Sequence, residues 1–179
     1  MLKNFVLATA VATGLLGAGT FSVASADETE ATAPSALDLQ VTAVEALVIQ
    51  YQDDAAGLQA AVEQLVINAA DPELAAGAVL VVFDNSQNPA IRAILARNTS
   101  LKDAAGRGLG AAIAQIGVTN PDLATRMSAQ VAADGSADMV ASVETGTNER
   151  TASIATSNQE NGDSQNDQDN TPENVSSDS

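Results

Sequence analysis

In three places along the chain an Asp or Asn is followed directly by proline, and each pair predicts the start of a helix. The pairs are Asp71-Pro72, Asn88-Pro89 and Asn120-Pro121. Asp and Asn side chains cap the free backbone N–H groups of a helix start, and proline fits the first helical position because its missing N–H would be unpaired there anyway. Apolar residues at helical spacing follow each pair. The chain is therefore predicted to fold as several short helices.

The stretch from Ser100 to Ala133 shows this pattern most fully. Ser100 is a predicted N-cap, and Gly117 is predicted to lie just beyond the end of the first helix. A second helix then begins at Asn120-Pro121, so we expect a helical hairpin. One face of its first helix carries apolar residues at helical spacing, namely Leu101, Ala105, Leu109, Ala112 and Ile116.

Further helix starts are predicted on both sides of this hairpin. Ser35 with Asp38 three residues later resembles a capping box, Asp53-Asp54 supplies another cap, and Ser136 is expected to cap a last short helix. The segment Ala78–Phe83 has two interpretations. It continues a helical pattern, but its β-branched residues are also typical of a buried strand.

The residue inventory favours an all-α fold. Cysteine is absent, and Tyr51 and Phe83 are the aromatic residues that remain after residue 26. The core must then consist mainly of Ala, Val, Leu and Ile, and small side chains suit helices that pack closely. We predict a small bundle of short helices over about residues 35–144.

The amino-terminal segment is predicted to be a secretory signal peptide spanning residues 1–26. Lys3 precedes an uncharged apolar run from Phe5 to about Ala18, and Ala24-Ser25-Ala26 is a small-x-small cleavage pattern. An uncleaved membrane anchor is the alternative, because the apolar stretch nearly reaches bilayer length. With residues 27–34 as a flexible lead-in, the mature protein is expected to be exported, to the periplasm or the extracellular space.

The carboxy-terminal residues 145–179 are rich in Ser, Asn, Asp, Gln and Thr and contain few large apolar side chains. Such a segment buries too little apolar surface to offset the entropy lost on ordering. It is predicted to be a disordered acidic tail. Deleting residues 146–179 should then leave thermal unfolding almost unchanged.

Two parts of the chain resemble each other weakly. Residues 62–65 before Asp71-Pro72 are similar to residues 113–116 before Asn120-Pro121. The helical domain could therefore contain two related helical hairpins. The alternative is that Asx-Pro is simply a common way to begin a helix.

The charge of the chain is strongly negative but uneven. The formal net charge is −16, and residues 27–91 contain acidic residues but no basic one. Basic residues concentrate between residues 92 and 126, where they could form an anion-binding patch or a dock for the acidic tail, or simply ordinary ion pairs. Together with two glycines of a small-residue ridge, they are the candidate contact surface: Arg92, Arg97, Lys102, Arg107, Gly106, Gly110 and Arg126.

The segment Gly106–Ala111 formally matches a dinucleotide-binding fingerprint, G-x-G-x-x-A. That fingerprint requires a preceding strand, whereas Leu101 to Ala105 is predicted to be helical. The favoured interpretation is a ridge of small residues, Gly106, Gly110 and Ala114, that lets another backbone approach closely. Because glycine costs about 1 kcal/mol of helix propensity relative to alanine, such a cluster needs a packing reason.

The side chains that most enzymes use are missing. The chain has no histidine and no cysteine, and no pair of carboxylates stands out. We expect a non-catalytic binding or structural module that needs no cofactor or metal, with another protein or a second copy as partner. The acidic chain is not expected to bind nucleic acid, or membranes after signal cleavage. The alternatives are a membrane-active or self-associating protein that uses the ridge at 106–114, and an enzyme with a carboxylate mechanism.

Overall fold

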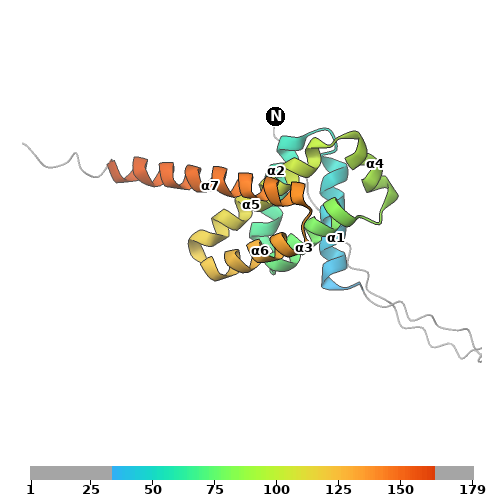
Figure 1. Cartoon of the computed structure of the whole chain (residues 1–179), viewed down its shortest axis with the longest axis horizontal. Coiled ribbons are helices and arrows are strands. Elements are labelled where there is room, and N and C mark those ends of the chain that lie inside the picture. The colour runs from blue at the N-terminus through green and yellow to red at the C-terminus, as the bar shows by residue number, and fades with distance from the viewer. Residues whose placement is uncertain (1–33, 164–179) are drawn as a thin grey trace, which may run out of the picture. The chain divides into compact units, whose positions relative to one another are not determined.

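The computed structural model describes residues 34–163, and side chains through residue 157 (Figure 1). This part of the chain is helical and contains no strand, so the predicted all-α bundle is confirmed. The predicted signal peptide and most of the lead-in lie outside the described residues. Seven helices follow in order: α1 (Ala36–Gln50), α2 (Ala55–Asn68), α3 (Pro72–Asn85), α4 (Pro89–Arg97), α5 (Ser100–Thr119), α6 (Pro121–Asp134) and α7 (Ala137–Asp163).

The predicted caps are in place at the starts of most helices. The side chain of Asp71 accepts a hydrogen bond from the backbone N–H of Leu74 at 3.0 Å, and Pro72 occupies the first helical position. The same arrangement begins α4 and α6, and Ser35 forms the predicted capping box with Asp38. These short-range contacts explain why the helix starts could be predicted from the sequence.

Two predicted boundaries of α5 are wrong. Thr99, rather than Ser100, is the N-cap residue, and its helical backbone already places Ser100 inside the helix. Gly117 does not end α5, which continues through Thr119. Asn120 both closes α5, donating its N–H to the carbonyl of Ile116 at 2.7 Å, and caps α6 through its side chain. One residue thus joins the two helices, so no glycine is needed at the turn.

Helix α5 is the centre of the fold, with α2 packed on one side and α7 on another, while α1 packs mainly against α3. Glycines allow these close approaches. A Cβ atom at Gly108 would overlap the carbonyl oxygen of Gln59 on α2, and one at Gly110 would overlap the carbonyl oxygen of Val143 on α7. The cluster of glycines therefore has the packing reason that its cost in helix propensity requires.

The ambiguous segment Ala78–Phe83 is helical and lies within α3. Five of its six side chains are buried, with Val81 on the exposed side. Burial on most sides of the helix explains the nearly continuous apolar run, because a helix surrounded by neighbours needs little polar surface.

The prediction that the helical domain ends near residue 144 is wrong. Helix α7 continues to Asp163, and Figure 1 shows its last turns running on beyond the neighbouring helices. Gly146 is buried against the backbone of Arg107 on α5, and Arg150 forms an ion pair with Glu63 on α2. Small and polar residues make these contacts, so hydrophobicity did not reveal them. Residues 164–179 of the predicted tail lie outside the described part.

Helices α3 and α6, which are the second helices of the two similar parts of the sequence, lie side by side and run in the same direction. Near their starts, Arg126 on α6 contacts Glu73 on α3 at 2.9 Å. Near their ends, the backbone N–H of Ser136, just after α6, donates to Asp84 on α3 at 2.9 Å. The relation between two hairpins stays a prediction, but this parallel pair forms the frame of the site described below.

Candidate ligand-binding groove

The two glycines of the predicted contact surface are not on the surface. Gly106 and Gly110 are buried beneath α7, next to Ser142 and Val143 respectively. The ridge does let another backbone approach closely, as predicted, but that backbone belongs to the same chain. With α7 in place, Gly106 and Gly110 are covered, whereas Ala114, the third residue of the ridge, is half-buried.

Three of the predicted basic residues form separate ion pairs. Lys102 contacts Asp84 at 2.7 Å, and Arg126 contacts Glu73 on α3. Arg107 contacts Glu149 on α7 at 3.1 Å, besides Asp103 on its own helix. The structure therefore does not bring these side chains together as one patch. Glu149 lies in the segment that was predicted to be a tail, so one contact between this segment and the basic residues is present.

The remaining basic residues of the predicted surface, Arg92 and Arg97, lie exposed on the short helix α4. The guanidinium group of Arg97 donates to the carbonyl oxygen of Ala93, one turn earlier on the same helix. Arg92 lines a shallow hollow beside Asp84 and Asn85. Two exposed arginines on one helix do not by themselves define an anion site.

Asp84 links three parts of the bundle. Its carboxylate accepts hydrogen bonds from the backbone N–H and the hydroxyl of Ser136 and forms the ion pair with Lys102, while its side chain is 6% exposed. Burial by itself raises the pKa of Asp84, but the Lys102 and Ser136 contacts together outweigh it and hold the pKa below its ordinary value. The carboxylate is therefore a structural anchor at the ends of α3 and α6.

Replacing Asp84 with asparagine is expected to lower the free energy of unfolding at neutral pH by about 2 to 3 kcal/mol, because Lys102 loses its buried partner. A lowered folded pKa means that this stabilisation is complete above the unfolded pKa, near 3.8, and is lost as the pH falls through the folded pKa. Urea unfolding should therefore show the difference between wild type and Asp84→Asn shrinking below about pH 4.

Asp53→Asn is the matched control. Asp53 is exposed, so this substitution removes the same charge without depriving a buried side chain of its partner. This variant should change stability by less than about 0.5 kcal/mol. An Asp84→Asn deficit that stays constant down to pH 2 would contradict the role assigned to the Asp84 carboxylate.

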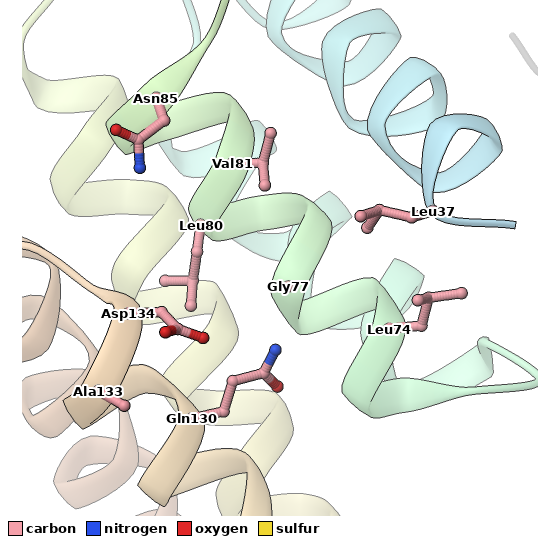
Figure 2. A pocket seen from close by; sticks show the side chains of 9 residues that line it. All are labelled: Leu37, Leu74, Gly77, Leu80, Val81, Asn85, Gln130, Ala133 and Asp134. Atoms are coloured by element: carbon pink, nitrogen blue, oxygen red, sulfur yellow. The ribbon is translucent and has the colours of Figure 1, made fainter. Parts of the chain in front are cut away.

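A groove with a volume of about 580 Å³ runs along α3. Figure 2 shows its floor on the outward side of α3, with Leu37 of α1 on one side and the carboxyl end of α6 on the other. We call this the α3 groove. Its lining residues are Leu37, Leu74, Gly77, Leu80, Val81, Asn85, Gln130, Ala133 and Asp134.

The two sides of the α3 groove differ in polarity. Leu37 and Val81 are 37% and 36% exposed, so the α1 side and the floor of the groove present apolar surface to solvent. The α6 side instead presents the amide of Gln130 and the carboxylate of Asp134, and both point toward the groove in Figure 2. Neither side chain has a hydrogen-bond or ion-pair partner within residues 34–157. The groove thus combines exposed apolar surface with polar groups whose bonding capacity is free.

The sequence analysis did not predict the α3 groove. One signal was present, because Leu74, Gly77 and Val81 recur on the side of α3 where charged residues would be expected on an ordinary surface helix. Because Gly77 has no side chain, the groove is deeper there than at Leu74 and Val81. The α1 and α6 walls could not be predicted, since they depend on how distant helices pack.

A second hollow contains two carboxylates, the feature that a carboxylate enzyme would need. It has a volume of about 510 Å³ and includes Asp103 and Asp138 beside Phe83 and Leu95. The Asp103 side chain is 51% exposed and already binds Arg107 and Ser142, and Asp138 is exposed. General acid–base catalysis by carboxyl groups relies on a group withdrawn from water into an apolar cleft, and this hollow does not supply that environment.

The nucleotide fingerprint has no structural counterpart. Gly106 to Ala111 lies in the middle of α5, and no strand precedes it within the described residues. The described side chains also form no group of three or more His, Cys, Asp or Glu residues placed to hold a metal ion. Within residues 34–163, no helix combines the length and the apolarity that crossing a bilayer requires.

Comparison with known proteins gives no assignment. No protein-family model, curated protein or solved structure matches this chain. The geometry and chemistry of the α3 groove are therefore the basis for a functional proposal.

Proposed function

We propose that this chain is an exported, non-catalytic module that binds a small apolar molecule in the α3 groove. The observation that carries the proposal is the apolar floor on an otherwise well-buried helix, in which Val81 is exposed and Leu74 and Gly77 are half-buried. A volume of about 580 Å³ falls within the usual range of small-molecule sites, roughly 300 to 1,000 Å³.

The other parts of this proposal come from the sequence. Export follows from the predicted signal peptide at residues 1–26, and the absence of histidine and cysteine favours binding over catalysis. A small ligand suits the narrow groove better than the protein partner expected from the sequence, because a stable protein interface usually buries about 800 Å² on each side.

Substituting Gly77 with leucine tests the proposal by filling the floor of the groove. A Cβ atom at Gly77 would meet only the flexible amide end of Gln130, at 2.9 Å, so the helix should accept the new side chain. Titration with the neutral fluorophore N-phenyl-1-naphthylamine should show saturable binding to the wild type. Binding by Gly77→Leu should be at least about tenfold weaker, because the fluorophore and the leucine compete for the same space.

Ala96→Leu is the matched control, since Ala96 lies exposed on α4 and the substitution adds a similar side chain outside the groove. It should bind the fluorophore as the wild type does. Melting curves followed by circular dichroism establish that both variants are folded. Failure of the wild type to bind, or equal binding by Gly77→Leu, would overturn the proposal.

A further inference from the structure

Two helices end at the same end of the α3 groove. Helix α3 ends at Asn85 and α6 ends at Asp134, and the hydrogen bonds from Ser136 to Asp84 hold these ends together. The carboxyl end of a helix carries a partial negative charge, because its last carbonyl groups lack helical partners. The amino-terminal end of α7, which begins at Ala137, lies at the same place and carries the opposite partial charge, so the charge presented to a ligand here is set by side chains.

Asp134 adds a full negative charge at this end. It is the last residue of α6, and its side chain is exposed. Its carboxylate points into the groove in Figure 2 and has no partner in the described part of the chain. A carboxylate that faces an apolar groove and has no partner is a candidate for binding the cationic group of a ligand.

Nearby basic side chains do not neutralise Asp134. Lys102 binds Asp84, one residue before the end of α3, and its ammonium group is engaged by that carboxylate at 2.7 Å. Arg92 lines the separate hollow beside Asp84, and Arg126 pairs with Glu73 near the opposite, amino-terminal end of α3. The net charge of −16 also raises the concentration of cations around the molecule.

Resting on the proposed function, we infer that the ligand of the α3 groove is a cationic amphiphile, with an amine beside Asp134 and an apolar chain along Leu74, Gly77 and Val81. Charge complementarity selects this class over anionic or neutral amphiphiles. From Leu74 to Asn85 the groove follows α3 for about 16 Å, at about 1.5 Å per residue. That length suits an extended alkyl chain, and the Gln130 amide offers a further hydrogen bond to the amine or to a neighbouring polar group.

The test compares three ten-carbon ligands that differ in their head groups: decylamine, decanol and decanoate. Each displaces N-phenyl-1-naphthylamine from the full chain at concentrations below its micelle threshold. Decylamine should bind at least about tenfold more tightly than decanoate, with decanol between them. Asp134→Asn should remove most of this preference by weakening the binding of decylamine and strengthening that of decanoate.

Asp122→Asn is the matched control, because Asp122 is an exposed residue of the same helix that does not line the groove. It removes the same charge from the chain and should preserve the preference for decylamine. Equal binding of decylamine and decanoate by the wild type, or an unaltered preference in Asp134→Asn, would overturn the inference. Binding of decanol by the wild type would still uphold the proposed function. If neither decanol nor the fluorophore binds, the proposed function fails as well.

Discussion

Replacing Gly110 with alanine is expected to lower the free energy of unfolding by about 2 to 3 kcal/mol, although alanine is the better helix former by about 1 kcal/mol. The new Cβ atom would overlap the carbonyl oxygen of Val143 and lie 2.7 Å from the backbone nitrogen of Thr147. Both atoms belong to the backbone of α7, so no rotamer change can relieve the overlap. Urea unfolding followed by circular dichroism measures the loss.

Gly117→Ala is the matched control in the same helix. A Cβ atom at Gly117 would lie 3.5 Å from the Cβ atom of Ala124, an ordinary van der Waals distance. This variant should gain about 0.5 to 1 kcal/mol from helix propensity alone. If Gly110→Ala is stabilised to the same extent as Gly117→Ala, then α7 does not lie against α5 at the described distance.

Deleting residues 146–179 is expected to lower the melting temperature by on the order of 10 °C or more. The deletion removes Gly146, which lies against the backbone of Arg107, and Thr147, whose hydroxyl donates to the carbonyl oxygen of Gly110. It also removes Arg150, the ion-pair partner of Glu63, whose side chain is only 14% exposed. Composition alone predicts no change for this deletion, so the experiment distinguishes sharply between the two expectations.

A shorter deletion, of residues 158–179, is the control for the loss of negative charge and chain length. It keeps each contact that α7 makes with α5 and α2 through Gly146, Thr147 and Arg150. Its melting temperature should stay within about 4 °C of that of the full chain, which corresponds to a change of about 1 kcal/mol or less. Thermal unfolding followed at 222 nm measures both deletions, and equal stability of the two would show that the middle of α7 does not support the bundle.

Much of the fold could be predicted because its signals are local. Asp71, Asn88 and Asn120 hydrogen-bond to backbone groups two or three residues away, so each cap is readable without knowledge of the rest of the fold. The helical interpretation of Ala78–Phe83 needed the neighbouring helices to confirm it, because its β-branched apolar residues are also typical of a buried strand. Alternatives of this kind remain open wherever residue type reflects burial more than backbone geometry.

The candidate site could not be predicted in the same way. The basic residues between Arg92 and Arg126 were predicted as a contact surface because positive charge is rare in this chain, but Lys102, Arg107 and Arg126 pair with carboxylates of other helices. The α3 groove was not predicted, because its floor consists of ordinary apolar residues. What makes it a site is the position of Leu37 and Asp134 on its two sides.

The stretch from Ser100 to Ala133 illustrates the difference between what the sequence determined and what only the tertiary structure decided. By itself the sequence determined that this stretch is helical, that it is interrupted at Asn120-Pro121, and that its glycines need a close neighbour, because propensity and capping act within a few residues. Only the tertiary structure decided that the neighbours are α2 and α7, and that polar residues beyond Thr145 belong to the folded bundle. Gly110 and Thr147 are 37 residues apart in the sequence but lie in contact in the fold. Shape complementarity between such distant segments leaves no periodic pattern in either of them.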